Sequence, residues 1–159
     1  MVKKIVSGGQ TGVDRAALDA AIEAGLAHGG WCPKGRKSED GMVPAHYLLD
    51  ETPGSGYTQR TAWNVRDSDG TLIIARGVLT EGSLYTFECA LQAARPVMVV
   101  RPEDREVSVA IHAWIVRYGL ETLNVAGPRA SSDPDIYAAA RSIVETFIGC
   151  GRRNIPEGF

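Results

Sequence analysis

The chain has 159 residues, the usual length of a single domain. Hydrophobic residues make up 44% of it, enough for one core, and a formal net charge of −2 argues against a protein that coats nucleic acid. No apolar run approaches the ~20 residues of a membrane helix, and the first residues lack the apolar stretch of a signal peptide. We therefore expect a cytoplasmic protein with neither a membrane nor a nucleic-acid partner.

Cysteine and histidine usage gives no sign of a metal site. The three cysteines (Cys32, Cys89 and Cys150) are an odd number, widely spaced and without a CxxC pair, which disfavours a disulfide framework or a structural zinc site. The three histidines show no ligand spacing. The sequence predicts no protein-bound metal ion.

Strand-like and helix-like patterns alternate along the chain. In the first half, residues 3–7 read as a strand, 13–24 as a helix that Gly25 ends, and 26–32 as a weak strand. In the second half the pattern predicts strands at 71–75, 97–100 and 122–125, and helices at 83–94, 106–118 and 133–148.

This alternation predicts a mainly parallel sheet with helices on both faces. The fold class is therefore α/β, a Rossmann-like three-layer αβα arrangement in a single domain. We expect a ligand-binding domain over residues 1–150 and a C-terminal tail over 151–159. Residues 33–57, rich in glycine, proline and charge, form a long loop or lid in this prediction.

In a parallel sheet, ligands bind at the carboxyl ends of the strands. The first strand is followed by the run SGGQTGVDR, whose glycines allow backbone N–H groups to approach an anion. The run matches neither GxGxxG nor a Walker A loop, and a tight turn with ordinary glycines is the alternative. The run GWCPKGRKS has arginine in place of the Walker lysine; its Lys34 is either a lid cation that reaches an anion or part of a solvated loop.

Two further loops carry polar residues at strand ends. Gly82 and Ser83 start a helix and suit an oxyanion, and Glu88, one turn later, is either a general base or a solvent-facing side chain. Arg129 lies between a strand end and a helix start, where it either clamps an anion or is simply exposed.

Several motifs together resemble the molybdenum carrier family, which includes the molybdenum-cofactor carrier proteins and is similar to a circularly permuted branch of the LOG-like Rossmannoid proteins. The motifs are, in order, GGQTGVDRAALDAA, GWCPKGRKSEDG, RTAWNVRDSDGTLI, LTEGSLYTFECA and LNVAGPRAS. They extend from Ile5 to about Ile148. The resemblance implies a Rossmann-like domain with an anionic pterin or nucleotide in the strand-end cleft.

The resemblance carries site residues onto four segments. They are Gly8, Gly9, Gln10, Thr11, Gly12 and Asp14; Arg60, Thr61 and Asn64; Thr80, Gly82, Ser83 and Glu88; and Gly127, Pro128, Arg129 and Ser131. The PGGxGTxxE motif of LOG-type enzymes, whose glutamate takes part in cleaving a nucleoside monophosphate, is not reproduced in this chain.

The leading hypothesis is a carrier that binds molybdenum cofactor (molybdopterin), or a related phosphorylated pterin or nucleotide-like anion, without turnover. Backbone N–H groups of the first two loops would hold the anion, Arg129 with Arg60 or Lys34 would offset its charge, and Asn64 or Gln10 would bond the pterin. The cargo would pass to a molybdoenzyme acceptor, and by analogy the carrier would be a homo-oligomer.

Two other functions stay open at this point. One is an enzyme that hydrolyses the N-glycosidic bond of a nucleotide, with Glu88 or Asp14 as the acid–base group. The other is a module that senses nucleotides without turnover. Glycine-rich loops fit all three functions, because they recognise phosphate rather than the rest of the ligand.

Overall fold

Five parallel strands form the central sheet of the computed structural model, which describes residues 1–153. They are β1 (Lys4–Val6), β2 (Ala27–Gly29), β7 (Gly70–Ile74), β8 (Val97–Val100) and β9 (Thr122–Ala126), in the spatial order β2-β1-β9-β7-β8. Every residue of β7 is buried, as expected of a parallel strand that is covered on both faces. The predicted α/β class and parallel sheet are confirmed.

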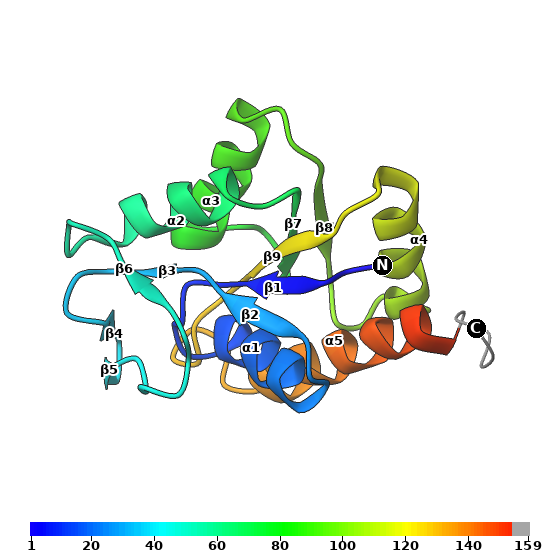
Figure 1. Ribbon diagram of the computed structural model, residues 1–159, viewed down its shortest axis with the longest axis horizontal. Coiled ribbons are helices and arrows are strands. Elements are labelled where there is room, and N and C mark those ends of the chain that lie inside the picture. The colour runs from blue at the N-terminus through cyan, green and yellow to red at the C-terminus, as the bar shows by residue number, and fades with distance from the viewer. Residues whose placement is uncertain (154–159) are drawn as a thin grey trace.

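Helices cover both faces of this sheet (Figure 1). On one face lie α1 (Val13–Glu23), α4 (Val107–Tyr118) and α5 (Ile136–Arg153), whose side chains share the main hydrophobic core with the strands. On the other face α2 (Tyr57–Arg66) packs against α3 (Glu81–Gln92) over a smaller core. The result is the predicted three-layer arrangement.

The predicted helix ends agree with the structure at one place and differ at another. Gly25 follows α1 with φ 69°, and its N–H donates to the carbonyl of Ile22, which ends the helix as expected. Helix α5 instead continues to Arg153, past the predicted end near Ile148. The last six residues of the predicted tail, 154–159, lie outside the described residues.

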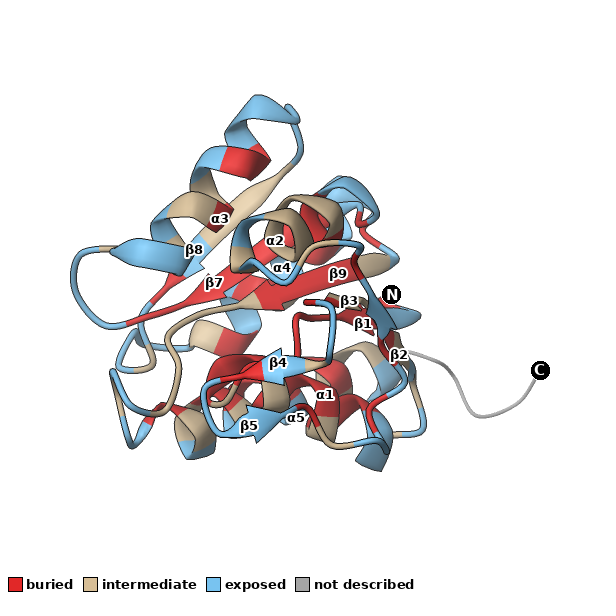
Figure 2. Cartoon of the chain, turned by 90° about the vertical axis from the view of Figure 1, so that its left-hand side faces the viewer, coloured by how far each residue is buried: buried red, intermediate tan, exposed pale blue. Residues whose placement is uncertain are grey.

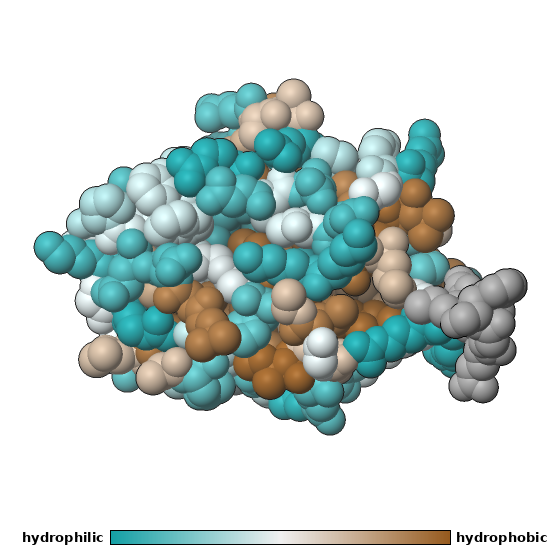
Figure 3. Space-filling view, in the orientation of Figure 1, coloured by the Kyte–Doolittle hydropathy of each residue, from teal (hydrophilic) through white to brown (hydrophobic). Residues whose placement is uncertain are grey.

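Helix α2 was not predicted from the sequence. Only Asn64 and Val65 of its ten residues are buried, so it lacks the apolar stripe that reveals a surface helix. Figure 3 shows hydrophilic to neutral residues over α2, whereas hydrophobic residues reach the surface mainly lower on that face, around α1. Tertiary packing against α3 therefore supports this helix more than its own pattern does.

Residues 33–57, called the strap below, are an ordered segment with short pieces of sheet. β4 (Lys37–Ser38) pairs with β5 (Gly41–Met42), and β6 (Asp50–Glu51) pairs with β3 (Trp31–Cys32). Figure 2 shows β4 and β5 in front of α1, with β5 exposed and with Ser38 of β4 buried. The predicted strand 26–32 is thus divided into β2 and β3, with Gly30 at φ 129° between them.

A small core and one arginine hold the strap together. Val43, Tyr47 and Leu49 pack on Cys32 and on Leu18 of α1. The guanidinium of Arg36 donates to the backbone carbonyls of strap residues 43, 44, 47 and 49, at 2.8–3.2 Å. Arg36 is therefore used in folding the strap. Whether the strap moves as a lid stays a prediction.

Among residues 1–153, no helix combines the length and the apolar character needed to cross a membrane.

The packing of β7 leads to a test of the core. Leu72 is fully buried in the main core, so Leu72→Ala is expected to lower the free energy of unfolding by about 2–5 kcal/mol in urea denaturation. Val116→Ala, at a position 60% exposed on α4, should change it by no more than about 0.5 kcal/mol. Equal losses in the two variants would contradict this description of the core.

Candidate functional site

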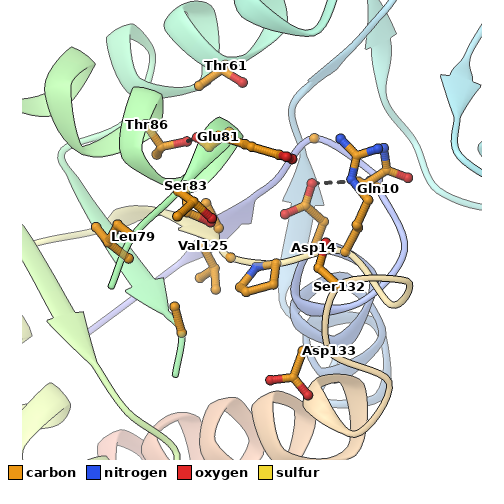
Figure 4. A pocket seen from close by; sticks show the side chains of 18 of the residues that line it. Gln10, Asp14, Thr61, Leu79, Glu81, Ser83, Thr86, Val125, Ser132 and Asp133 are labelled. Carbon is orange, nitrogen blue, oxygen red and sulfur yellow. Dashed lines mark hydrogen bonds between the residues drawn. The ribbon is translucent and has the colours of Figure 1, made fainter. Parts of the chain in front are cut away.

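A cleft of about 300 Å³ opens at the carboxyl edge of the sheet. Its walls come from the loops after the neighbouring strands β1, β7 and β9, together with one side of α2. The predicted site residues that line it are Gly8, Gln10, Asp14, Arg60, Thr61, Asn64, Thr80, Gly82, Ser83, Gly127, Pro128 and Arg129. Figure 4 shows Gln10 and Asp14 on one wall and Glu81, Ser83 and Thr86 on another.

The structure places the other candidate residues outside this lining. They are Gly9, Thr11, Gly12, Lys34, Glu88 and Ser131. Lys34 is exposed on the strap, and Glu88 is exposed on α3. Neither side chain is positioned for the role that the sequence suggested.

The first loop uses its own backbone donors. The N–H of Gln10 donates to Oδ2 of Asp14 at 3.2 Å, and that of Thr11 donates to Oε1 of Gln10 at 3.1 Å. The N–H of Val13, the first residue of α1, donates to the carbonyl of Pro128. These three N–H groups are engaged within the protein and are not free to hold an anion. Binding of an anion by the other N–H groups of this loop stays a prediction.

Close packing explains two of the loop's glycines. At Gly12, with φ 83°, a Cβ would lie 2.3 Å from the carbonyl oxygen of Pro128. At Gly9, with φ 76°, it would lie 2.7 Å from Leu49 and 2.9 Å from Val43. Only glycine lets the loop contact both the strap and the last loop, so these glycines serve packing.

The start of α3 offers backbone donors to the cleft. Thr80 is extended and Glu81 adopts φ 48°, and among the described residues no side chain caps the helix. The first N–H groups of a helix have no partner within it and carry partial positive charge. Gly82 and Ser83 line the cleft at this end, so the partial positive charge of the helix start lies beside the cleft.

Gln10 and Asp14 carry the most unusual polar groups of the site. Gln10 is only 5% exposed, and its Nε2 has no hydrogen-bond partner among the described residues. Asp14 is buried, which raises its pKa because water no longer stabilises the charge. Arg60, 3.8 Å away, acts in the opposite direction.

Asn64, a predicted pterin partner, has a structural role. Its Oδ1 accepts from the backbone N–H of Trp31 at 2.8 Å, and its Nδ2 donates to the carbonyl of Trp31 at 3.0 Å. The Asn64 amide thereby bonds both backbone polar groups of Trp31, as a neighbouring strand would, and links the start of β3 to α2. Both ends of the amide are taken, so Asn64 is not free to bond a ligand in this state.

The charges of the cleft largely cancel. Arg60 lies beside Asp14 and donates to the carbonyl of Gly8 at 2.8 Å. Arg76 pairs with both Asp133 and Glu103. Arg129 is less committed, because its Nε lies 4.0 Å from Glu39 and its side chain is 34% exposed.

Sequence reasoning left several cleft residues unassigned. They are Arg76, Glu81, Thr86, Ser132 and Asp133. Arg76 and Glu81 stand in the loop after β7 that the sequence singled out. Ser132 and Asp133 directly follow Ser131, the last predicted site residue, and this position in the chain is the signal that could have identified them as cleft residues.

Glu39 of the strap fastens two of the loops. Its carboxylate accepts hydrogen bonds from the hydroxyl of Thr11 and from both the backbone N–H and the hydroxyl of Ser131. Its own N–H donates to Oε1 of Gln10 at 2.9 Å. The hydrogen bonds from Ser131 and Thr11 hold the pKa of Glu39 below its ordinary value.

The next strap residue, Asp40, is fixed in a similar way. Both its carboxylate oxygens accept from Arg15 of α1, at 2.6 and 2.8 Å, and the hydroxyl of Ser38 donates to it as well. These contacts, with Arg15 first, hold the pKa of Asp40 far below its ordinary value. Thr11 and Ser131, which the sequence predicted to bind a ligand, donate hydrogen bonds to Glu39 of the strap.

Taken together, the parallel sheet and the helices on both its faces define a single Rossmann-like α/β domain with a cleft at the carboxyl edge of the sheet. The chain belongs to the circularly permuted YpsA SLOG family, whose model matches residues 5–148. This agrees with the resemblance drawn from the sequence motifs.

A solved structure supports the same assignment. A crystal structure of a protein from Syntrophus aciditrophicus, named "Putative molybdenum carrier protein", is 47% identical in sequence and superposes with a TM-score of 0.89. The match covers 92% of this chain and 95% of that one. No curated protein sequence matches the chain.

Attachment of the strap through Glu39 should depend on pH. Because its folded-state pKa is lowered, Glu39 adds stability above its ordinary pKa of 4.5, and this stability is lost as the pH falls through the lowered value. Glu39→Gln should lower the free energy of unfolding by about 1–2 kcal/mol at pH 7 and by much less below about pH 4.

Thermal and urea unfolding across this pH range measure the difference. Glu88→Gln is the matched control, since Glu88 is exposed. A deficit of Glu39→Gln that stays constant down to pH 3 would show that ionisation of Glu39 does not hold the strap.

Proposed function

We propose that the protein is a small-ligand carrier which binds a phosphorylated pterin, such as molybdenum cofactor, or a similar nucleotide-like anion in the cleft without turnover. The observation that carries this proposal is the set of donors facing the cleft. The uncapped start of α3, the amide of Gln10 and the guanidinium of Arg129 all offer hydrogens. The name of the 47% identical protein supports molybdenum-related cargo.

The donor set suits an oxyanion better than a bare metal ion. Among residues 1–153, no three His, Cys, Asp or Glu side chains converge to hold a metal. An N-terminal helix end and an arginine recognise phosphate or molybdate oxygens through hydrogen bonds instead. In this proposal the cargo's metal is carried within the ligand and the protein binds the ligand's oxygens. A molybdoenzyme would then be the acceptor.

Cargo can be measured on protein purified from molybdenum-replete cells. Mass spectrometry for the metal and fluorescence of the oxidised pterin should both report cargo, and Arg129→Ala should lower affinity by about 10- to 100-fold, as expected for loss of a charged hydrogen bond. Arg117→Ala is the matched control, because Arg117 is exposed on α4 at the opposite edge of the sheet. Purified protein that is empty and takes up no added cofactor would overturn the carrier function.

A second candidate function is hydrolysis of an N-glycosidic bond, and the buried state of Asp14 favours it. A carboxyl whose pKa is raised by burial suits a general acid. It would protonate the leaving base as the C–N bond breaks. Water would add to the sugar carbon and give up a proton to the Asp14 carboxylate, which restores the acid. Glu81, in its left-handed conformation, reaches into the same cleft (Figure 4). Of the two acid–base candidates from the sequence, Glu88 and Asp14, only Asp14 lines the cleft.

Product analysis separates this candidate from the carrier. Chromatography of nucleoside monophosphates after incubation should show free base if the chain is a hydrolase. Release should be lost in Asp14→Asn and retained in Glu88→Gln, since Glu88 lies outside the cleft. Absence of free base in the unmodified protein would eliminate the hydrolase.

A further inference from the structure

The side chain of Gln10 is fixed in one orientation by its neighbours. Two backbone N–H groups, those of Thr11 and Glu39, donate to its Oε1 at 3.1 and 2.9 Å. If the amide oxygen and nitrogen were exchanged, the amide NH2 would face the N–H groups of Thr11 and Glu39, and donors would face donors. The positions of Oε1 and Nε2 are therefore determined. Nε2 therefore remains at the cleft as a hydrogen-bond donor.

This donor is the one buried side-chain polar atom without a partner in the described chain. Leaving a buried donor unpaired costs on the order of 1–3 kcal/mol, and such groups in folded proteins call for an explanation. Gln10 is 95% buried yet lines the cleft. A ligand atom that accepts a hydrogen bond would satisfy it.

Asp14 supplies an acceptor beside this donor. Its Oδ2 accepts from the N–H of Gln10 at 3.2 Å. The Ser7 hydroxyl, which donates to the carbonyl of Val125, also lies near the carboxylate, but two carboxylate oxygens can accept more hydrogen bonds than these. Figure 4 shows the two side chains next to each other on one wall of the cleft. This wall thus offers a hydrogen-bond donor beside a hydrogen-bond acceptor. A complementary ligand group has an acceptor beside a donor.

Electrostatics indicate that this group is not the anionic end of the ligand. A phosphate placed against the Asp14 carboxylate would meet a like charge, and Arg60, 3.8 Å from that carboxylate, is already paired with it. The start of α3 and Arg129 lie on other walls of the cleft and attract the anion. The wall with Gln10 and Asp14 is left for an uncharged polar part of the same molecule.

From this arrangement we infer that Gln10 and Asp14 recognise a lactam edge, in which a ring carbonyl stands next to a ring N–H. The carbonyl oxygen accepts from Nε2 of Gln10, and the N–H donates to Oδ1 of Asp14. Guanine, hypoxanthine and pterins share this edge, whereas adenine lacks the ring carbonyl. The inference rests on the proposed binding function and specifies which part of the ligand this wall reads.

Calorimetric titration with a set of related phosphates tests this. The probes are GMP, IMP, AMP, ribose 5-phosphate and a pterin with a phosphorylated side chain. GMP, IMP and the pterin should bind at least about tenfold more tightly than AMP and ribose 5-phosphate, because a site built for a hydrogen-bonding group rejects ligands that lack it. Comparing the pterin with GMP then distinguishes the two sources of the lactam.

Two substitutions probe the wall itself. Gln10→Glu keeps an acceptor for the N–H groups of Thr11 and Glu39 but replaces the free donor, and Asp14→Asn replaces the free acceptor. Each should reduce the preference for IMP over ribose 5-phosphate to less than about threefold while ribose 5-phosphate still binds. Gln92→Glu, which adds the same charge at an exposed position at the end of α3, should keep the full preference.

The outcomes separate this inference from the function on which it rests. Equal binding of all five probes, or tighter binding of AMP, would overturn the lactam assignment and leave an anion carrier in place. Preference for lactam ligands that survives both substitutions would also overturn it. Failure of every probe to bind would overturn the carrier function together with the inference.

Discussion

A parallel sheet with both faces buried is the constraint on which the rest of this structure depends. Each pair of parallel neighbours needs a crossover, and each face needs a cover. Helices α1, α4 and α5 supply one cover and α2 and α3 the other. The same rule brings the carboxyl ends of β1, β9 and β7 side by side, so three loops meet at one edge and enclose the cleft.

Within that edge, two kinds of loop have different tasks. The loop after β1 and the loop after β9 are tied to each other and to the strap through Thr11, Ser131 and Glu39. The N–H groups of Gln10, Thr11 and Val13 and the close approaches of Gly9 and Gly12 take part in this mutual packing. The loop after β7 leads into an uncapped helix and keeps its donors free. Rigid support on one side and open hydrogen-bonding capacity on the other suit a site that holds a ligand.

The sequence predicted the sheet because a buried strand such as Thr71–Ala75 can be recognised from its consecutive apolar residues. It did not predict α2, whose ten residues bury only two side chains. Twelve of the residues that it singled out, from three loops and α2, line one cleft, since strand ends converge in any parallel sheet. It could not tell that Asn64 and Thr11 are used within the protein, because their partners Trp31 and Glu39 are 33 and 28 residues away.

One feature of Gln10 has a thermodynamic consequence. A single amide group bonds the strap through Oε1, where the N–H of Glu39 donates, and faces the cleft through Nε2. The side chain of Gln10 therefore takes part both in attaching the strap and in lining the cleft. Linkage is reciprocal: if an attached strap improves the affinity for cargo by some factor, bound cargo strengthens the strap's attachment by the same factor. Release of cargo and detachment of the strap would then be thermodynamically coupled.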